Sequence, residues 1–197
     1  MRNKTAAGKM PALIFQKEIY MATDRLSFFT IDSSYCHYLR QFDLRVPDNG
    51  FSKTGRPFVG IVFKINDYHY YASLTSPKDK HKNMVNAIDF LKINDGTWGA
   101  INFNNMIPVP EGLLTKIDIS SLPTNTKEEL NYKNLLQNQL SWCNSIKNKS
   151  AILKNATLLY HRITKGKPHH NLKIRCCDFI VLEQQCMDYC KFNNISL

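Results

Sequence analysis

The stretch from Leu74 to Lys82, Leu-Thr-Ser-Pro-Lys-Asp-Lys-His-Lys, places two hydroxyls, three lysines and one histidine within nine residues. A hydroxyl can hydrogen-bond a phosphate or orient a nucleophile, and a nearby ammonium group can stabilise charge that develops on phosphoryl oxygens. An alternating apolar run precedes the stretch and Pro77 ends any strand there, so we expect Thr75 and Ser76 at a strand end. The composition suits phosphodiester chemistry, although a polar turn with solvated lysines uses the same residues.

A second group of cations precedes a predicted hairpin. The segments Phe58–Ile65 and Tyr68–Leu74 are rich in β-forming residues and are joined by Asn66-Asp67, a pair typical of two-residue hairpin turns. The loop before the first strand contains Lys53 and Arg56. Because hairpin strands return to where they began, we expect Arg56 near the two hydroxyls.

The overall charge favours a polyanionic partner. The 197 residues carry 26 Lys and Arg against 16 Asp and Glu, a formal net charge of +10. Such an excess favours nucleic acid through counterion release. No apolar run approaches the roughly 20 residues that span a bilayer, and no signal peptide or helix-turn-helix signature stands out. We therefore expect a soluble, cytoplasmic protein that binds nucleic acid and no membrane, and the missing helix-turn-helix disfavours DNA binding.

The cysteines are expected to be free thiols. Their number is even, but the absence of a signal peptide implies a reducing compartment. A zinc site formed by the C-terminal cysteines with His169 and His170 is the alternative, but it lacks a paired Cys-x-x-Cys. We favour buried helical cysteines and no metal or other cofactor. The six are Cys36, Cys143, Cys176, Cys177, Cys186 and Cys190.

The remaining pattern predicts strands first and helices later. Period-two or β-rich runs predict further strands at Leu26–Ile31, Ile88–Ile93, Trp98–Ile107 and Leu113–Ile119. Asp32 or Ser33 is expected to cap a helix after the first strand, and Thr126-Lys127-Glu128-Glu129 forms a capping box. Helical stripes then follow, which we interpret as core: Tyr132, Leu136, Leu140, Cys143 and Ile146; Ile152, Ala156, Leu159 and Ile163; and Phe179, Leu182, Cys186 and Tyr189.

These elements predict an α+β fold, a single compact domain with a strongly curved, mainly antiparallel sheet surrounded by helices. Residues 21–197 form this domain. We interpret residues 1–20 as a basic extension that is either disordered or a mis-assigned start, and we expect them to be dispensable. Tyr70, Tyr71 and Trp98 could stack bases on an open sheet face, but aromatic residues at such spacing are more often core.

Several segments together resemble the ToxN/AbiQ family of type III toxin-antitoxin endoribonucleases. They occur in order across about two thirds of the chain after Met21, and Leu74-Thr75-Ser76-Pro77-Lys78 is the most specific. The others are Phe28-Phe29-Thr30-Ile31, Tyr38-Leu39, Phe42-Asp43, Val46-Pro47, Phe58-Val59-Gly60-Ile61-Val62, Ile101-Asn102-Phe103, Met106-Ile107-Pro108 and Tyr132-Lys133. Two departures stand out: a family tyrosine expected before Arg56 is absent, and Arg56 replaces a family lysine.

The resemblance implies a metal-independent endoribonuclease toxin, with a role in phage defence by abortive infection. It would cleave mRNA by attack of a ribose 2′-hydroxyl, leaving 2′,3′-cyclic phosphate and 5′-hydroxyl ends. An antitoxin RNA of pseudoknot repeats would inhibit it in a closed toxin-RNA assembly. The residues that match the active site are Thr75, Ser76, Lys78 and Arg56, and those expected to contact RNA are Lys53, Lys80, His81, Lys82 and Tyr132.

The residues alone leave two points open. His81 and His69 lie close enough in sequence to act as a general base, but we interpret each as a bystander and assign no base. The same cations would also suit a non-enzymatic RNA-binding module, which cleavage of any RNA would exclude.

Overall fold

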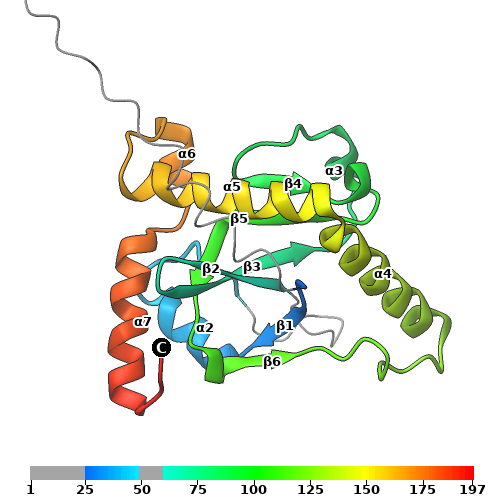
Figure 1. The fold of residues 1–197 in the computed structure, drawn as a ribbon, viewed down its shortest axis with the longest axis horizontal. Helices are drawn as coiled ribbons and strands as arrows, with labels where there is room; N and C mark the ends of the chain where they lie inside the picture. The colour runs from blue at the N-terminus through cyan, green and yellow to red at the C-terminus, as the bar shows by residue number, and fades with distance from the viewer. Residues whose placement is uncertain (1–24, 49–59) are drawn as a thin grey trace, which may run out of the picture.

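The structure, a computed structural model, describes residues 25–48 and 60–197 and consists of one antiparallel sheet with helices packed on it (Figure 1). Six strands pair in the order β4-β5-β3-β2-β1-β6, and the sheet is open, with β4 and β6 at its edges. The predicted α+β class with a mainly antiparallel sheet is confirmed. The strands are β1 (Phe28–Ile31), β2 (Gly60–Ile65), β3 (Tyr68–Thr75), β4 (Phe90–Lys92), β5 (Ala100–Pro108) and β6 (Leu114–Lys116).

The predicted hairpin is present and supplies the middle of the sheet. Ile65 pairs with Tyr68 across the turn, where Asn66 adopts the left-handed conformation with φ of 52°. On its other side β3 pairs with β5, and the register shifts between Tyr71 and Ser73. Such a β-bulge bends a strand and increases its twist. The bulge therefore bends β3, a central strand of the sheet, shortly before the strand ends at Thr75.

The helices begin where the capping residues predict. Asp32 accepts hydrogen bonds from the backbone N–H groups of Ser34 and Tyr35, and Thr126 and Glu129 form the expected capping box. Two short helices near polar stretches, α3 and α6, were not predicted. The helices are α2 (Ser33–Arg40), α3 (Asp79–Asn83), α4 (Lys127–Asn144), α5 (Ile146–Thr164), α6 (His170–Arg175) and α7 (Phe179–Asn193), with 3₁₀ turns η1 (Asn94–Gly96) and η2 (Glu111–Leu113).

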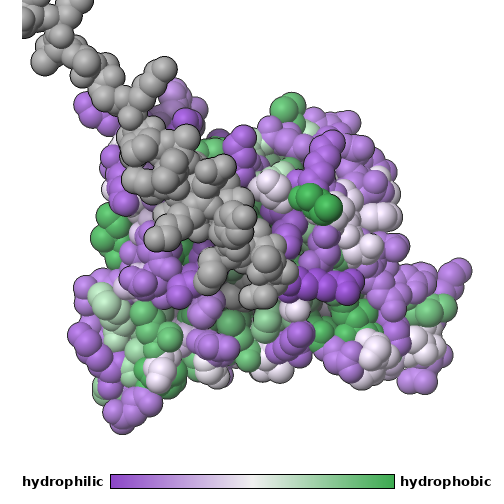
Figure 2. Space-filling model, viewed as in Figure 1, coloured by the Kyte–Doolittle hydropathy of each residue, from purple (hydrophilic) through white to green (hydrophobic). Residues whose placement is uncertain are grey.

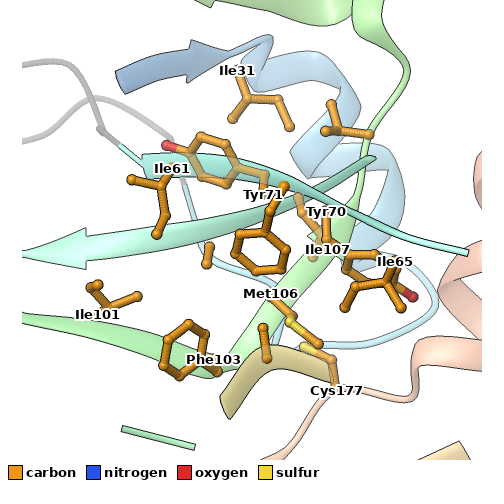
Figure 3. Close-up of a cluster of buried hydrophobic side chains, with 14 of the residues drawn as sticks. Ile31, Ile61, Ile65, Tyr70, Tyr71, Ile101, Phe103, Met106, Ile107 and Cys177 are labelled. Carbon is orange, nitrogen blue, oxygen red and sulfur yellow. The ribbon is translucent and has the colours of Figure 1, made fainter. Parts of the chain in front are cut away.

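Both faces of β3 are covered, so the neighbouring Tyr70 and Tyr71 are both buried (Figure 3). Successive strand residues point to opposite faces. The Tyr70 ring packs on Tyr160 of α5 and Phe179 of α7, and its hydroxyl donates to Glu183 at 2.8 Å. Both tyrosines are therefore core residues and do not lie on an open sheet face where bases could stack.

Two buried carboxylates, each paired with an arginine, connect the second half of the chain to the first. Asp43 is buried and accepts hydrogen bonds from Arg45 and from the backbone N–H of Asp178 at 2.8 Å. Arg175 of α6 holds the buried Asp89, with its Nη2 3.0 Å from Oδ1. Asp89 directly precedes β4, so the second pair anchors the edge strand nearest to the site.

The helical stripes are core with one exception. Ile146 is 90% exposed, so its assignment to the first stripe was wrong. The reason is that α4 ends at Asn144 and Ser145 caps a new helix, which changes the direction of the side chains that follow.

All six cysteines are buried free thiols, as predicted. Burial raises the pKa of Cys143 and Cys186 to about 12, so both stay protonated. Within residues 25–48 and 60–197, no three His, Cys, Asp or Glu side chains are grouped so as to hold a metal ion. Nor does this part of the chain contain a helix long and apolar enough to cross a bilayer, and the face in Figure 2 is predominantly hydrophilic.

Candidate active site

The sequence Thr75-Ser76-Pro77-Lys78 forms the turn by which the chain leaves the central strand. Thr75 is the last residue of β3 and pairs with Ala100 of β5, whose carbonyl oxygen accepts a long hydrogen bond of 3.4 Å from the Thr75 hydroxyl. Ser76 and Lys78 are exposed. The sheet thus holds one hydroxyl in place and presents the next hydroxyl and an ammonium group to solvent.

The backbone of Gly99 packs directly against the backbone of this turn. Its φ is +95°, and a Cβ built on it would lie 2.0 Å from the Thr75 carbonyl oxygen and 3.2 Å from the Ser76 carbonyl carbon. Only glycine permits both this conformation and this approach without strain. The backbone that carries the two hydroxyls therefore rests directly on the backbone at residue 99.

Gln139 of α4 holds Trp98, the residue before Gly99, through a hydrogen bond. The side chain is buried, and its Nε2 donates a 2.6 Å hydrogen bond to the carbonyl oxygen of Trp98. A buried amide paired with a buried carbonyl is costly to disrupt, because either group alone would be left unsatisfied. The contacts run from α4 through Trp98 and Gly99 to Thr75, so a helix positions the turn.

Helix α3 follows the turn and gathers the predicted lysines. Lys78 caps it, and the His81 N–H donates to the Lys78 carbonyl at 2.9 Å. Lys82 pairs with Asp79 at 3.1 Å, an exposed contact worth little in stability, and Lys80 is also exposed. Lys78, Lys80 and Lys82 therefore lie within one short helical segment beside the two hydroxyls.

His81 is the buried residue of this helix, with 2% of its surface exposed. Its ring packs 5.8 Å from that of Phe90, centroid to centroid, and no described residue hydrogen-bonds its Nδ1. Burial, and then the charges of Lys78 and Lys80, lower its pKa. The ring is therefore neutral near pH 7 and faces the protein interior, which agrees with the bystander interpretation of its catalytic role. Its predicted contact with RNA stays a prediction.

A lysine that sequence reasoning missed joins this cationic group. Lys92 of β4 pairs with Ala100, the residue that Thr75 meets from the other side. Directly paired residues share a face, so Lys92 and Thr75 lie on the same face, about 10 Å apart across two strand spacings. The Lys92 ammonium donates to the Lys82 carbonyl at 3.3 Å. The pairing of β3, β5 and β4 places it there, and no local pattern could have revealed it.

Tyr132 occupies α4 and is half-buried, with a buried hydroxyl. Burial, and then the nearby Cys36 and Tyr132, raise the pKa of the Tyr71 hydroxyl. Tyr132 therefore lies near the buried Tyr71 of β3, and its predicted contact with RNA stays a prediction. Lys53 and Arg56 lie outside the described residues. The register does pair Gly60 with Ser73, two residues before Thr75, so β2 begins at this end of the hairpin.

Comparison with known proteins identifies the family. The family "Toxin ToxN, type III toxin-antitoxin system" matches residues 27–187. Endoribonuclease ToxN of Bacillus thuringiensis subsp. kurstaki is 35% identical over 170 residues, which cover 84% of this chain and 85% of that protein.

Solved structures agree with the sequence match. One is of a bacterial type III toxin-antitoxin system with selective toxin inhibition by a non-coding RNA pseudoknot. It has a TM-score of 0.68 and 36% identity, and covers 84% of this chain and 98% of the other. Another is AbiQ, a lactococcal anti-phage endoribonuclease of the type III class, with a TM-score of 0.67, 26% identity and coverage of 85% and 99%. The chain therefore belongs to the ToxN family of type III toxin-antitoxin endoribonucleases.

Proposed function

We propose that this toxin cleaves RNA at the Thr75–Lys78 turn without a metal ion. The observation that carries the proposal is the turn itself. It presents hydroxyls and an ammonium group at the end of the central strand, on a backbone held by Gly99 and Gln139. These are the groups that a phosphodiester transition state needs around it.

The reaction is an internal transesterification in which the RNA supplies its own nucleophile. The ribose 2′-oxygen forms a bond to the adjacent phosphorus as its proton departs, and the bond from phosphorus to the 5′-oxygen breaks as that oxygen gains a proton. The products are a 2′,3′-cyclic phosphate and a 5′-hydroxyl. No redox partner or bound water nucleophile is required.

Each site residue has a distinct part in this step. Thr75 and Ser76 orient the 2′-hydroxyl or the scissile phosphate through hydrogen bonds. Lys78 and Arg56 stabilise the extra negative charge on the phosphoryl oxygens. Removing one such donor in other enzymes slows the reaction by on the order of 10² to 10³. His81 is not assigned the proton, because its ring is buried.

A folded RNA is the proposed inhibitor. A toxin of solved structure and related sequence is selectively inhibited by a non-coding RNA pseudoknot. We infer that an antitoxin RNA of pseudoknot repeats occupies the same cationic surface here, in a closed toxin-RNA assembly, because groups that bind substrate phosphates also bind those of an inhibitor. A role in phage defence follows by relation to the anti-phage AbiQ.

The test of the chemistry is cleavage of a defined RNA in the presence of excess EDTA, followed by analysis of the product ends. Undiminished cleavage with cyclic-phosphate and 5′-hydroxyl ends is the expected result. Loss of cleavage in EDTA with recovery in magnesium would reject the metal-free mechanism.

The inhibitor is tested by purifying the toxin from cells that also carry the DNA upstream of its gene. Recovery of a discrete, repeated RNA bound to an inactive toxin is expected. Protein that is recovered without RNA, and that remains lethal while the upstream repeats are transcribed, would refute RNA inhibition.

A further inference from the structure

We propose that the outer face of α5 binds RNA phosphates outside the cleavage site, an inference that rests on the proposed function. The contacts are backbone contacts to a long or folded RNA and carry no base specificity. The face consists of four exposed cations: Lys147, Lys154, Arg162 and Lys165, the last directly following the helix.

The distribution of charge along the chain first indicates this surface. Residues 130–177 contain nine Lys and Arg and not one Asp or Glu, although the whole chain has 16 acidic residues. This region covers most of α4 and all of α5 and α6, and it accounts for nearly all of the net charge of +10. A merely solvated helical surface normally mixes both signs, since like charges repel and opposite charges at helical spacing attract.

Helical geometry places the four cations on one side. At 100° per residue, residues 147, 154, 162 and 165 fall within about 80° of one another. The buried residues Ile152, Ala156 and Leu159 lie on the opposite side, and α5 packs through that side on β5 and α7 (Figure 1). The cations therefore point away from the sheet, in a line about 27 Å long at 1.5 Å per residue.

The start of α5 supplies a second, independent observation. Lys147 and Lys149 lie in its first turn, which contains no acidic residue. The positive end of a helix dipole disfavours cations, so folding stability alone would select acidic residues there, as in the first turn of α4. A departure from this local rule at the exposed Lys147 is typical of a functional surface.

The α5 cations are structurally connected to the cleavage site. Helix α4, which holds the catalytic turn through Gln139, leads directly into α5 at Ser145. Helix α5 also packs on β5, the strand that pairs with Thr75 and Lys92. An RNA cleaved at the turn and extending past it in this direction would meet the α5 cations.

The experiment compares two charge-matched variants of the full chain. The first combines Lys147→Gln, Lys154→Gln, Arg162→Gln and Lys165→Gln. The control removes four exposed lysines from other surfaces: Lys64→Gln, Lys116→Gln, Lys127→Gln and Lys191→Gln. Binding of a structured RNA of about 40 nucleotides is measured from 50 to 200 mM salt, and cleavage is measured on a short oligonucleotide.

The α5 variant is expected to reduce the slope of log affinity against log salt by about 3, since each lost phosphate contact contributes about 0.7 to 0.9. It should weaken binding of all long RNAs alike while it cleaves the short substrate at the wild-type rate. Its melting temperature should stay close to that of the wild type, because Lys147 opposes the helix dipole while Arg162, in the last turn, and Lys165, at the C-cap, complement it.

Equal loss in both variants would show a net-charge effect and overturn the inference. So would unchanged long-RNA affinity in the α5 variant, with short-substrate cleavage intact in the wild type. Failure of the wild type to cleave any RNA would instead reject the proposed function. Loss of binding to anionic lipid vesicles with unchanged RNA affinity would assign the face to a membrane, and would likewise overturn the inference.

Discussion

Gly99 and Thr75 approach so closely that a Cβ on Gly99 would lie 2.0 Å from the Thr75 carbonyl oxygen. The two residues are 24 positions apart in the chain and meet because β3 pairs with β5. The candidate catalytic turn therefore packs against a backbone position that has no room for a side chain. This contact makes the position of the two hydroxyls a property of the sheet.

Gly99→Ala is expected to displace the turn. The alanine would have to keep a positive φ, which costs on the order of 1–3 kcal/mol. Its methyl group would also clash with the Thr75 carbonyl oxygen. We expect a lower melting temperature and a large loss of RNA cleavage. Gly112→Ala is the control, because its Cβ would meet only Ile195, at 3.7 Å. Wild-type cleavage by Gly99→Ala would show that the turn tolerates movement.

Gln139→Leu is expected to loosen the same support from the helix side. The substitution leaves the Trp98 carbonyl without its buried donor, at a cost of roughly 1–3 kcal/mol in the free energy of unfolding. We expect kcat on RNA to fall further than KM rises, since the turn would sample unproductive positions. Gln137→Leu, on the exposed side of α4, is the matched control. An equal effect of both substitutions on kcat would argue against positioning by Gln139.

His81 predicts a pH dependence of stability. Its pKa is lowered in the folded protein by burial and by Lys78 and Lys80, so protons bind the unfolded chain more tightly. The free energy of unfolding should therefore be highest above the ordinary histidine pKa of about 6.5, and it should decrease as the pH falls below that value. His81→Phe keeps an aromatic ring against Phe90 and removes the titration. Urea unfolding at pH 7.5 and 5.5 should show a smaller decline in this variant.

The exposed His37 provides the comparison for that measurement. His37→Gln should leave the decline between pH 7.5 and 5.5 as large as in the wild type. If His81→Phe declined as steeply as His37→Gln, the neutral, buried state of His81 would not be the source of the pH dependence.

Local signals in the sequence predicted the elements that depend on local chemistry. The Asn66-Asp67 turn, the Asp32 cap and the capping box at Thr126 each use short-range hydrogen bonds or backbone preferences, and each is present. Helix α3 was missed because it is five residues long and begins just after Pro77, in a stretch that also fits a polar turn.

The candidate site was predicted only in part for a related reason. The turn that holds Thr75 and Ser76 could be located, because an alternating run and a proline mark a strand end. Its supports could not, since Gly99, Gln139 and Lys92 reach it through strand pairing and helix packing. The glycine beside Trp98 was a usable signal, because glycine at a strand end often marks close backbone approach.

Ser76 and Lys78 are proposed to act in the chemical step rather than in RNA binding. Single-turnover cleavage and RNA affinity should be measured together for Ser76→Ala and Lys78→Ala, with Ser150→Ala and Lys116→Ala as exposed controls. We expect each turn variant to cleave on the order of 10² to 10³ more slowly, with RNA affinity within about threefold of the wild type. Cleavage by either turn variant at close to the wild-type rate would contradict the account.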